Sequence, residues 1–363
     1  IQGGTSSLGT VIDSNYLRNL PLNGRAFLQL GLLSPGSAPP APGSELSTQN
    51  ASGLHFSGAR ESANSFLLDG GDNNDWFINR IVVSPSLEFI QEFKVQSSNY
   101  NAEFGRNGGA QVLIVTRSGG NRFHASAYDF FRNAVLDARN LYDPPDQPIP
   151  QFQRNQFGFF AAGPIHKDRA FFSGSYEGAR VRQAITRTAR VPTPAEKSGD
   201  FSGLGSPVRD PFTGQPFPGN RIPADRLDPI GQSIARLYPD PNRTDPQANL
   251  VSTPVGRLDS DQVSVRTDFK LSTRDSLFLR YSFAGDDSQE PFNEGATNLP
   301  GFGSLIVGRA QHLVISQTQV FRLRRHVVRF EAVGAQRRRG RERLGNGRGR
   351  RLGGRCWVRC WRG

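Results

Sequence analysis

Two segments of about ten residues between Gln262 and Ala284 alternate between apolar and polar side chains. The apolar positions are Val263, Val265, Thr267, Phe269 and Leu271 in the first segment, and Leu277, Leu279, Tyr281 and Phe283 in the second. Successive side chains of a β-strand point to opposite faces of the sheet. The pattern therefore predicts a long antiparallel hairpin with one apolar and one polar face, closed by a tight turn over Ser272–Asp275.

A soluble β-sandwich and a membrane β-barrel both use such hairpins, and two details favour the barrel. The arms exceed the usual strand of about five or six residues and suit a tilted spanning strand. The predicted turn is short while other connections are long, as in barrels with short periplasmic turns and long outer loops. Residues Phe172–Glu177 repeat the alternation, and we expect residues 191–254, rich in Pro, Gly, Asp and Asn, to form an external loop.

Residues 1–120 predict a small mixed α/β unit. Arg25–Leu33 has helical apolar spacing and ends before Ser34-Pro35-Gly36. A flexible loop is expected over residues 36–52. Short β-branched or aromatic runs then indicate strands at Leu54–Phe56, Phe66–Leu68, Phe89–Val95 and Ala110–Thr116.

The charge of the chain is concentrated in its last 42 residues. The net charge of +12 and the pI near 10.4 suggest an anionic partner. However, residues 322–363 hold 15 of the 44 basic residues and 2 of the 32 acidic ones, which leaves 29 basic and 30 acidic residues before them. This Arg/Gly-rich tail is interpreted as disordered, out-of-frame sequence beginning after Phe321. The alternative is a nucleic-acid-binding tail that uses charge and Trp stacking.

Short sequence motifs, each different, are spread over most of the chain. In the first third they are Leu20–Arg25, Phe56–Arg60, Leu67–Gly70, Ile90–Val95, Asn101–Ala110 and Val115–Gly120. Further along they are Asp129–Asn133, Asn155–Gly158, Gly163–Ile165, Lys167–Arg169, Ser175–Gly178, Gly199–Ser202 and Asn220–Pro223. With these motifs, in this order over residues 10–321, the chain resembles the TonB-dependent outer-membrane receptors of the Oar-like type.

The resemblance implies an α+β plug domain over residues 1–120, followed by antiparallel transmembrane β-barrel strands over residues 121–321. It implies a Gram-negative outer-membrane protein that binds an extracellular small molecule, such as a chelate, or a sugar or peptide, and imports it with energy relayed by TonB. Its partners would be the TonB complex and outer-membrane lipid, whereas nucleic acid is not expected. Plug loops of the family help to hold the ligand, and here those loops carry Arg60, Asp72, Asn73, Asn74, Trp76 and Arg80. Ordinary turn residues are the alternative for each of them.

The chain is shorter than the resemblance requires. Transporters of this kind close about 22 strands around the plug. The residues that follow the plug here allow about six to eight strands at about ten residues per strand plus loops. The chain also contains no Met. We therefore expect a fragment with an incomplete barrel that does not transport by itself.

No residue pattern indicates catalysis or a metal site. The five histidines, His55, His124, His166, His312 and His326, have no ligand spacing. Asp69–Asp75 lacks the acidic spacing and closing Glu of a calcium loop, and Gly105–Gly109 lacks the Lys of a phosphate-binding loop. Cys356 and Cys360 have no second pair. We predict no catalytic residues, no cofactor and no metal, so the chain is not expected to be an enzyme. A secreted β-sandwich binding module is the third hypothesis.

Overall fold

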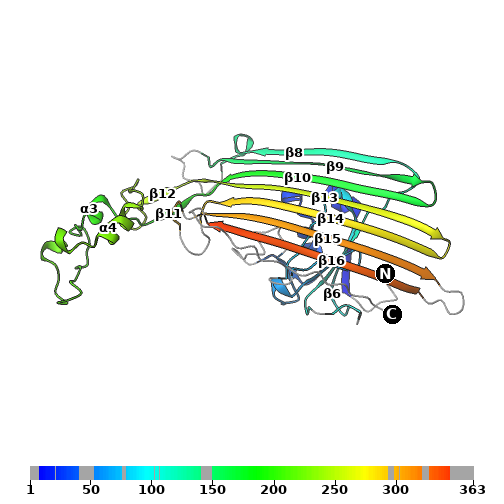
Figure 1. The fold of residues 1–363 in the computed structure, drawn as a ribbon, viewed down its shortest axis with the longest axis horizontal. Helices are drawn as coiled ribbons and strands as arrows, with labels where there is room; N and C mark the ends of the chain where they lie inside the picture. Colours follow the sequence, from blue (N-terminus) through cyan, green and yellow to red (C-terminus); the bar gives the residue numbers. More distant parts are fainter. Residues whose placement is uncertain are drawn as a thin grey trace.

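The fold was analysed in a computed structural model of the chain. The residues described are 8–20, 22–40, 53–75, 79–101, 103–105, 107–139, 149–292, 298–301, 303–320 and 327–343. Within them two sheets dominate, one near the N-terminus and a larger one formed by the long strands (Figure 1).

The N-terminal unit, residues 8–116, contains a five-stranded sheet of order β1-β6-β7-β4-β5. Its strands are β1 (Leu8–Asp13), β4 (Ser65–Leu68), β5 (Gly71–Asp72), β6 (Ile90–Ser98) and β7 (Gln111–Thr116). β4 and β7 pair in parallel, and the other neighbours are antiparallel. A separate two-stranded ribbon joins β2 (Ser37–Ala38) to β3 (His55–Phe56).

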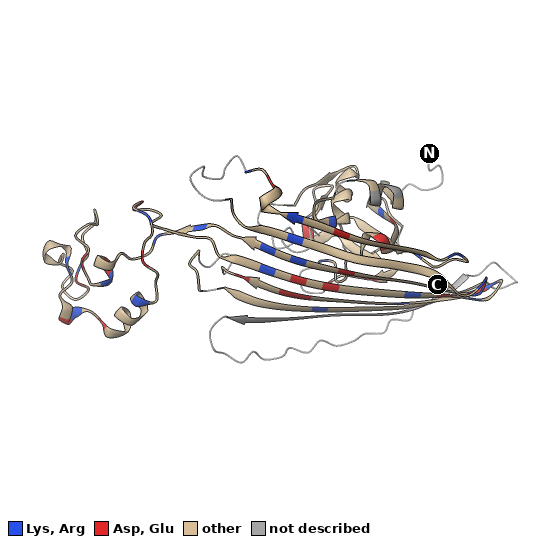
Figure 2. Cartoon of the chain, turned by 90° about the horizontal axis from the view of Figure 1, so that it is seen from above, with Lys and Arg blue, Asp and Glu red and all other residues tan. Residues whose placement is uncertain are grey.

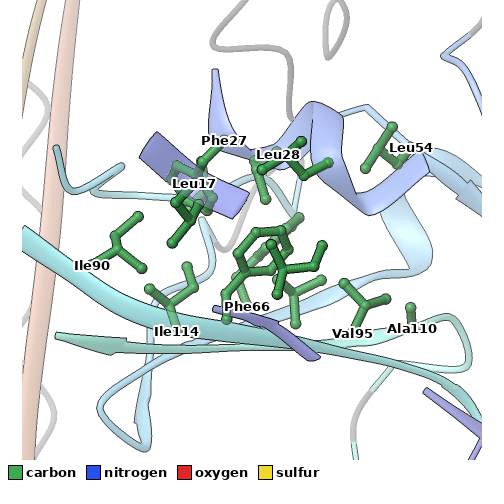
Figure 3. Close-up of a cluster of buried hydrophobic side chains, with 14 of the residues drawn as sticks. Leu17, Phe27, Leu28, Leu54, Phe66, Ile90, Val95, Ala110 and Ile114 are labelled. Carbon is green, nitrogen blue, oxygen red and sulfur yellow. The ribbon is translucent and has the colours of Figure 1, made fainter. Parts of the chain in front are cut away.

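One apolar cluster holds the N-terminal unit together. Helix α1 (Ser14–Asn19) and a 3-10 helix over Phe27–Leu33 lie on one face of the sheet, with further 3-10 turns at Asn23–Arg25, Glu61–Ala63 and Leu87–Phe89. Figure 3 shows Leu17, Phe27 and Leu28 from these helices pointing toward Phe66 and Ile114 of the sheet. Burying these side chains removes about 25 cal/mol per Å² of apolar surface from water, which stabilises the unit.

The large sheet has seven antiparallel strands in the order β16-β15-β14-β13-β10-β9-β8. The strands are β8 (His124–Asn133), β9 (Phe152–His166), β10 (Ala170–Ala184), β13 (Val255–Ser272), β14 (Asp275–Glu290), β15 (Ser304–Val320) and β16 (Val327–Arg343). Val263 lies opposite Phe283, so the predicted hairpin forms in the expected register, and its turn falls at Ser272–Asp275. The two strands of this hairpin, β13 and β14, have 18 and 16 residues rather than about ten, because charged residues beyond the apolar alternation continue the same ladder.

The insert between β10 and β13 is more ordered than the external loop that the sequence predicts. A two-stranded stem of β11 (Arg187–Ala189) and β12 (Leu250–Ser252) carries it beyond the large sheet (Figure 1). It contains α3 (Pro194–Lys197), α4 (Pro229–Arg236) and 3-10 turns at Pro218–Asn220 and Ala224–Arg226. A further 3-10 turn, Ala134–Leu136, follows β8.

Two other expectations differ from the structure. The helix predicted over Arg25–Leu33 is a pair of 3-10 segments, because the backbone is extended at Ala26 between them. The tail predicted to be disordered from residue 322 contains β16, which pairs residue by residue with β15 from Val327 to Arg343. Residues 327–343 form a strand because their backbone pairs with the edge of β15. Residues 321–326 and 344–363 lie outside the described part of the chain, as do the side chains of β16.

Candidate functional site

In its central strands, β13 and β14, the large sheet buries polar side chains and exposes apolar ones. On β14, Arg280 and Ser282 are fully buried, whereas Tyr281 between them is 42% exposed. On β13, Ser264 is buried while Val265 is 46% exposed. The buried face lies against the N-terminal unit. A soluble sandwich packs its apolar faces together, whereas a membrane barrel turns apolar side chains to lipid and keeps a polar interior. The observed arrangement is that of a barrel wall.

The centre of the interface is a buried carboxylate, Asp69, at the end of β4. It has a left-handed backbone, with φ of 53°. Its carboxylate accepts hydrogen bonds from the backbone N–H and the hydroxyl of Thr116, at 2.8 and 2.7 Å. From the large sheet, Arg280 Nε lies 2.6 Å away and Arg266 NH1 3.2 Å away. Arg266 also pairs with Asp268 at 2.7 Å. Two acidic and two basic side chains therefore neutralise one another inside the interface.

Arg280 also reaches two further points of the N-terminal unit, the Leu68 carbonyl directly and the Asp72 carbonyl through His312 of β15. It donates to the Leu68 carbonyl at 3.0 Å and lies 2.9 Å from Nδ1 of His312. Since an arginine can only donate, Nδ1 accepts and the proton of neutral His312 sits on Nε2. Nε2 then donates to the Asp72 carbonyl at 3.0 Å. Arg280 and His312 are both fully buried, so the loop Asp69–Asp72 is held to the wall by a continuous polar chain.

A second cluster forms around Arg25. Its guanidinium pairs with Glu88 of the N-terminal unit at 2.5 Å and lies 3.6 Å from Glu177 of β10. It also lies over the rings of Tyr128 and Phe130 of β8, at 4.3 and 4.7 Å from their centroids. Tyr128 donates to Glu177 at 2.5 Å. Two partners of Arg25 on the wall, Tyr128 and Glu177, are therefore bonded to each other, which fixes the geometry of the contact.

The link between the two sheets, residues 117–123, is fastened to the wall. The Arg117 carbonyl accepts from the Ser173 hydroxyl at 2.6 Å, and the Asn121 and Asp168 side chains meet at the turn between β9 and β10. At Gly119 an added Cβ would lie 2.3 Å from the Phe172 carbonyl oxygen. Only glycine allows so close a passage. A hollow of about 460 Å³ lies beside this link, lined in part by Arg266 and Lys270.

The model of the outer membrane beta barrel domain family matches residues 115–339, which is more than half of the chain. The chain belongs to this outer-membrane β-barrel family. The match continues past Phe321, where the sequence predicts the reading frame to end, and includes most of β16.

Comparison with relatives of the chain confirms its resemblance to Oar-like TonB-dependent receptors. It is 27% identical over 202 residues to the TonB-dependent transporter Oar of Myxococcus xanthus, covering 52% of this chain and 18% of that protein. The outer membrane transporter YddB of Escherichia coli shares the fold with a TM-score of 0.56 at 12% identity, over 92% of this chain and 39% of that one. The siderophore receptor PirA of Pseudomonas aeruginosa gives 0.53 at 10% identity, over 92% and 41%. The chain thus spans less than half the length of the proteins it matches.

The comparisons place this barrel chain in the outer membrane of Gram-negative bacteria, as predicted. The relatives are transporters and receptors rather than enzymes. No helix of the described residues is long and apolar enough to cross a membrane. Among those same residues, no group of three or more His, Cys, Asp or Glu side chains is placed to hold a metal ion.

Five of the six predicted ligand residues lie in the described part of the chain, and they differ in burial. Asn73 and Asn74 are buried, and their amides pair with the backbones of Val83 and Phe66. Both amide groups are thus bonded inside the N-terminal unit, and contact with a ligand stays a prediction for both residues. The Asp72 carboxylate accepts from Asn74, at 2.5 Å from its side-chain nitrogen and 3.1 Å from its backbone nitrogen.

The other three candidates differ in exposure. Arg60 is exposed. Arg80 is buried, with Nε 3.9 Å from Asp75. Trp76 lies outside the described residues. Among the five described candidates, Arg60 is therefore the fully exposed one, and ligand contact by all six residues stays a prediction.

Sequence reasoning did not single out the residues that fasten the unit to the wall. Arg266 and Arg280 stand on the polar face of the predicted hairpin, and Asp69 lies in a recognised motif, but they are about 200 positions apart in sequence. Alternation shows which face a residue is on. It does not show which distant carboxylate that face will meet. Charged side chains on a covered face require partners. The acidic residues of the N-terminal unit could therefore have been considered as partners of Arg266 and Arg280.

Proposed function

We propose that the chain comprises the plug domain, residues 1–120, and the first barrel strands, from residue 121 onward, of a TonB-dependent outer-membrane transporter. In this proposal the protein binds a ligand outside the cell and imports it through the plugged barrel. The observation that carries the proposal is the N-terminal unit seated on the buried polar face of a sheet whose apolar face is exposed.

The buried ions suit a plug that must stay in place and yet be released. A buried ion pair adds little net stability compared with apolar packing, but breaking it by removing one partner costs about 3–5 kcal/mol. Such contacts therefore specify position. Energy relayed by TonB would have to separate Asp69 from Arg280 and Arg25 from Glu177. Both pairs join the N-terminal unit to the large sheet, so their separation would free the loop Asp69–Asp72.

For the ligand we propose a polar compound, either a metal chelate, a sugar or a peptide, that contacts the end of the unit containing Arg60. Amide groups gather there. Asn79 donates to the carbonyls of Ser62 and Asn64, and Asn107 also donates to Asn64. Trp76, three positions before Asn79 in the sequence, is proposed as an aromatic contact. Two structural neighbours, the PirA proteins of Pseudomonas aeruginosa and Acinetobacter baumannii, are siderophore receptors, so ferric chelates are the first class to test.

We also propose that import requires more barrel than this chain provides. In the described sheet β8 and β16 are the outer strands, and unpaired backbone groups in lipid are costly. The chain alone would then bind ligand weakly or not at all. The nucleic-acid alternative is not favoured by the described residues, because Val327–Arg343 of the basic tail pair with β15.

Plug movement gives a direct test. A cysteine at Ala310, which is buried against Val82 and Val83, is introduced after Cys356 and Cys360 are changed to serine. The variant is produced in a Gram-negative host with and without TonB, joined to the remaining barrel strands of the Myxococcus relative. We expect a water-soluble maleimide to label it faster when TonB and a ferric siderophore, oligosaccharide or peptide pool are present. A matched Ser252→Cys variant on the stem should label equally under all conditions. TonB-independent labelling of Ala310→Cys with every pool would contradict the proposal.

A further inference from the structure

The outward face of the large sheet changes abruptly from apolar to charged residues toward the insert. On β13 the outward positions from Leu271 to Val263 are apolar apart from Thr267, and the next two are Asp261 and Asp259. The apolar part extends about 26 Å along the strand at about 3.3 Å per residue. At the tilt of about 40° usual in barrels this is about 20 Å across the membrane, close to the apolar band of about 25 Å. The change therefore occurs at the level of the lipid headgroups.

Aromatic side chains mark the same boundary. Tyr176 packs against Phe157 and Phe159, with ring centroids 6.1 and 6.0 Å apart. Tyr176 and Tyr281 both have hydroxyls in polar contacts, Tyr176 with Asp261 at 2.6 Å and Tyr281 with Gln311 at 2.9 Å. Aromatic girdles of this kind lie at membrane–water interfaces. Because the long insert emerges from this end, the boundary faces the cell exterior.

Beyond the aromatic residues lies an outer charged belt, which comprises Arg180, Arg182, Arg257, Asp259, Asp261 and Asp287. Its bonds form a ladder across three strands. Arg180 pairs with Asp261 at 2.9 Å and Arg182 with Asp259 at 2.6 Å. Arg257 pairs with Asp287 at 3.1 Å. Figure 2 shows charged residues gathered on the part of the strands nearer the insert, while most of the remaining length carries few.

The arginines of the belt remain accessible. The side chains of Arg180 and Arg182 are 35% and 33% exposed. The Arg180 guanidinium also lies 5.7 Å from the Phe157 ring, and that of Arg309 lies 5.4 Å from the Phe283 ring, on the same outward face. Planar guanidinium groups bind phosphate through paired hydrogen bonds and are weakly hydrated. Held against aromatic rings at headgroup level, they are placed to meet phosphate groups.

We propose that the outer charged belt binds phosphate groups of phosphorylated lipid headgroups in the outer leaflet, with Arg180 and Arg182 as the principal contacts. Continuity with the lipid-facing apolar band identifies the partner as lipid, and the guanidinium forks identify its phosphate. In this arrangement Asp259 and Asp261 orient the arginines and compete with phosphate for them. The proposal concerns the outside of the sheet and does not depend on ligand import.

The test uses the full chain in detergent micelles with either bisphosphorylated lipid A or the same lipid after dephosphorylation, and binding is measured by native mass spectrometry. The wild type should bind the phosphorylated lipid at least about tenfold more tightly, and the preference should decrease with added NaCl. The R180Q/R182Q variant should lose that preference. The matched control R209Q/R221Q, which removes two exposed arginines of the insert, should keep it.

The acidic partners separate phosphate binding from a purely structural ladder. With D259N/D261N the arginines are released, so phosphate binding should be unchanged or stronger. A structural role alone predicts that this variant loses binding as R180Q/R182Q does. If R180Q/R182Q lacks the β-sheet circular dichroism of the wild type, R180K/R182K takes its place and should lose part of the preference, because lysine has no fork. The proposal would be overturned if the wild type bound both forms of the lipid equally. It would also be overturned if R180Q/R182Q kept the same preference for the phosphorylated lipid as the control R209Q/R221Q.

Discussion

Replacing Asp69 with asparagine would remove one negative charge from the buried interface and leave its shape almost unchanged. Asn tolerates the left-handed backbone that residue 69 adopts, with φ of 53°. The change therefore adds little backbone strain. It leaves Arg280 fully buried without its carboxylate 2.6 Å away. The Asn amide nitrogen would also face guanidinium donors.

The expected loss is about 3–5 kcal/mol, the cost of breaking a buried ion pair by removing one partner. Thr116 donates its backbone N–H to one carboxylate oxygen of Asp69 and its hydroxyl to the other. The single oxygen of asparagine keeps one of these bonds, and this estimate does not include the loss of the other. At about 1.4 kcal/mol per tenfold change, the population with the N-terminal unit lifted from the wall should rise at least about 100-fold.

Labelling of a cysteine at Ala310 in increasing urea measures that population. Asp268→Asn is the matched control. Asp268 is more exposed, at 20% of its side chain against 2% for Asp69, and Arg266 keeps Asp69. It should cost about 1 kcal/mol or less. A double-mutant cycle with Arg280→Gln should show coupling between the two residues. If Asp69→Asn labels no faster than Asp268→Asn, the reasoning about the buried ion pair is wrong.

Three further changes test other parts of the chain. Gly119→Ala should lower the thermal unfolding midpoint, measured by circular dichroism, because its Cβ would lie 2.3 and 2.7 Å from carbonyl oxygens of β10 and β9. Asn249→Ala removes two 2.8 Å hydrogen bonds to the Val191 backbone. The free energy of unfolding of the insert should fall by about 2 kcal/mol, so a protease should cleave the insert faster. The hydrogen bond from Arg190 holds the pKa of Glu196 below its usual value, so the pair stabilises the insert above about pH 4.3 and loses this effect as the pH falls through the folded-state pKa. Arg190 is 37% exposed, so the loss should be at most about 1 kcal/mol, seen as faster hydrogen exchange at pH 3 than at pH 6 and absent in Glu196→Gln.

The sequence predicted the local part of this fold well. The alternation from Gln262 to Ala284 determines both the register and the separation of polar and apolar faces, because each depends on neighbours along one hairpin. The strands expected at Phe66–Leu68 and Ala110–Thr116 appear as β4 and β7 within one residue at each end. Their parallel pairing was not predicted, since it joins segments more than 40 residues apart.

Contacts between distant segments account for most of what the sequence could not supply. The candidate ligand residues were transferred by position within a motif, yet Asn73 and Asn74 are used inside the N-terminal unit. Helix α4 could have been expected, because Asp228 caps it and Pro229 occupies its first turn. The abundance of Pro and Gly around it obscured this signal. The strand β16 was obscured by its arginines, although its backbone pairs fully with β15.

The link of residues 117–123 also sets a limit on distance. Seven residues joining Thr116 to His124 extend at most about 25 Å. A strand such as β15, with 17 residues, is about 56 Å long. While the chain is intact, the end of β7 therefore stays within about half a strand length of the start of β8. In the proposed transport, separation of the buried ion pairs could therefore move the rest of the N-terminal unit while the end of β7 stays near the start of β8.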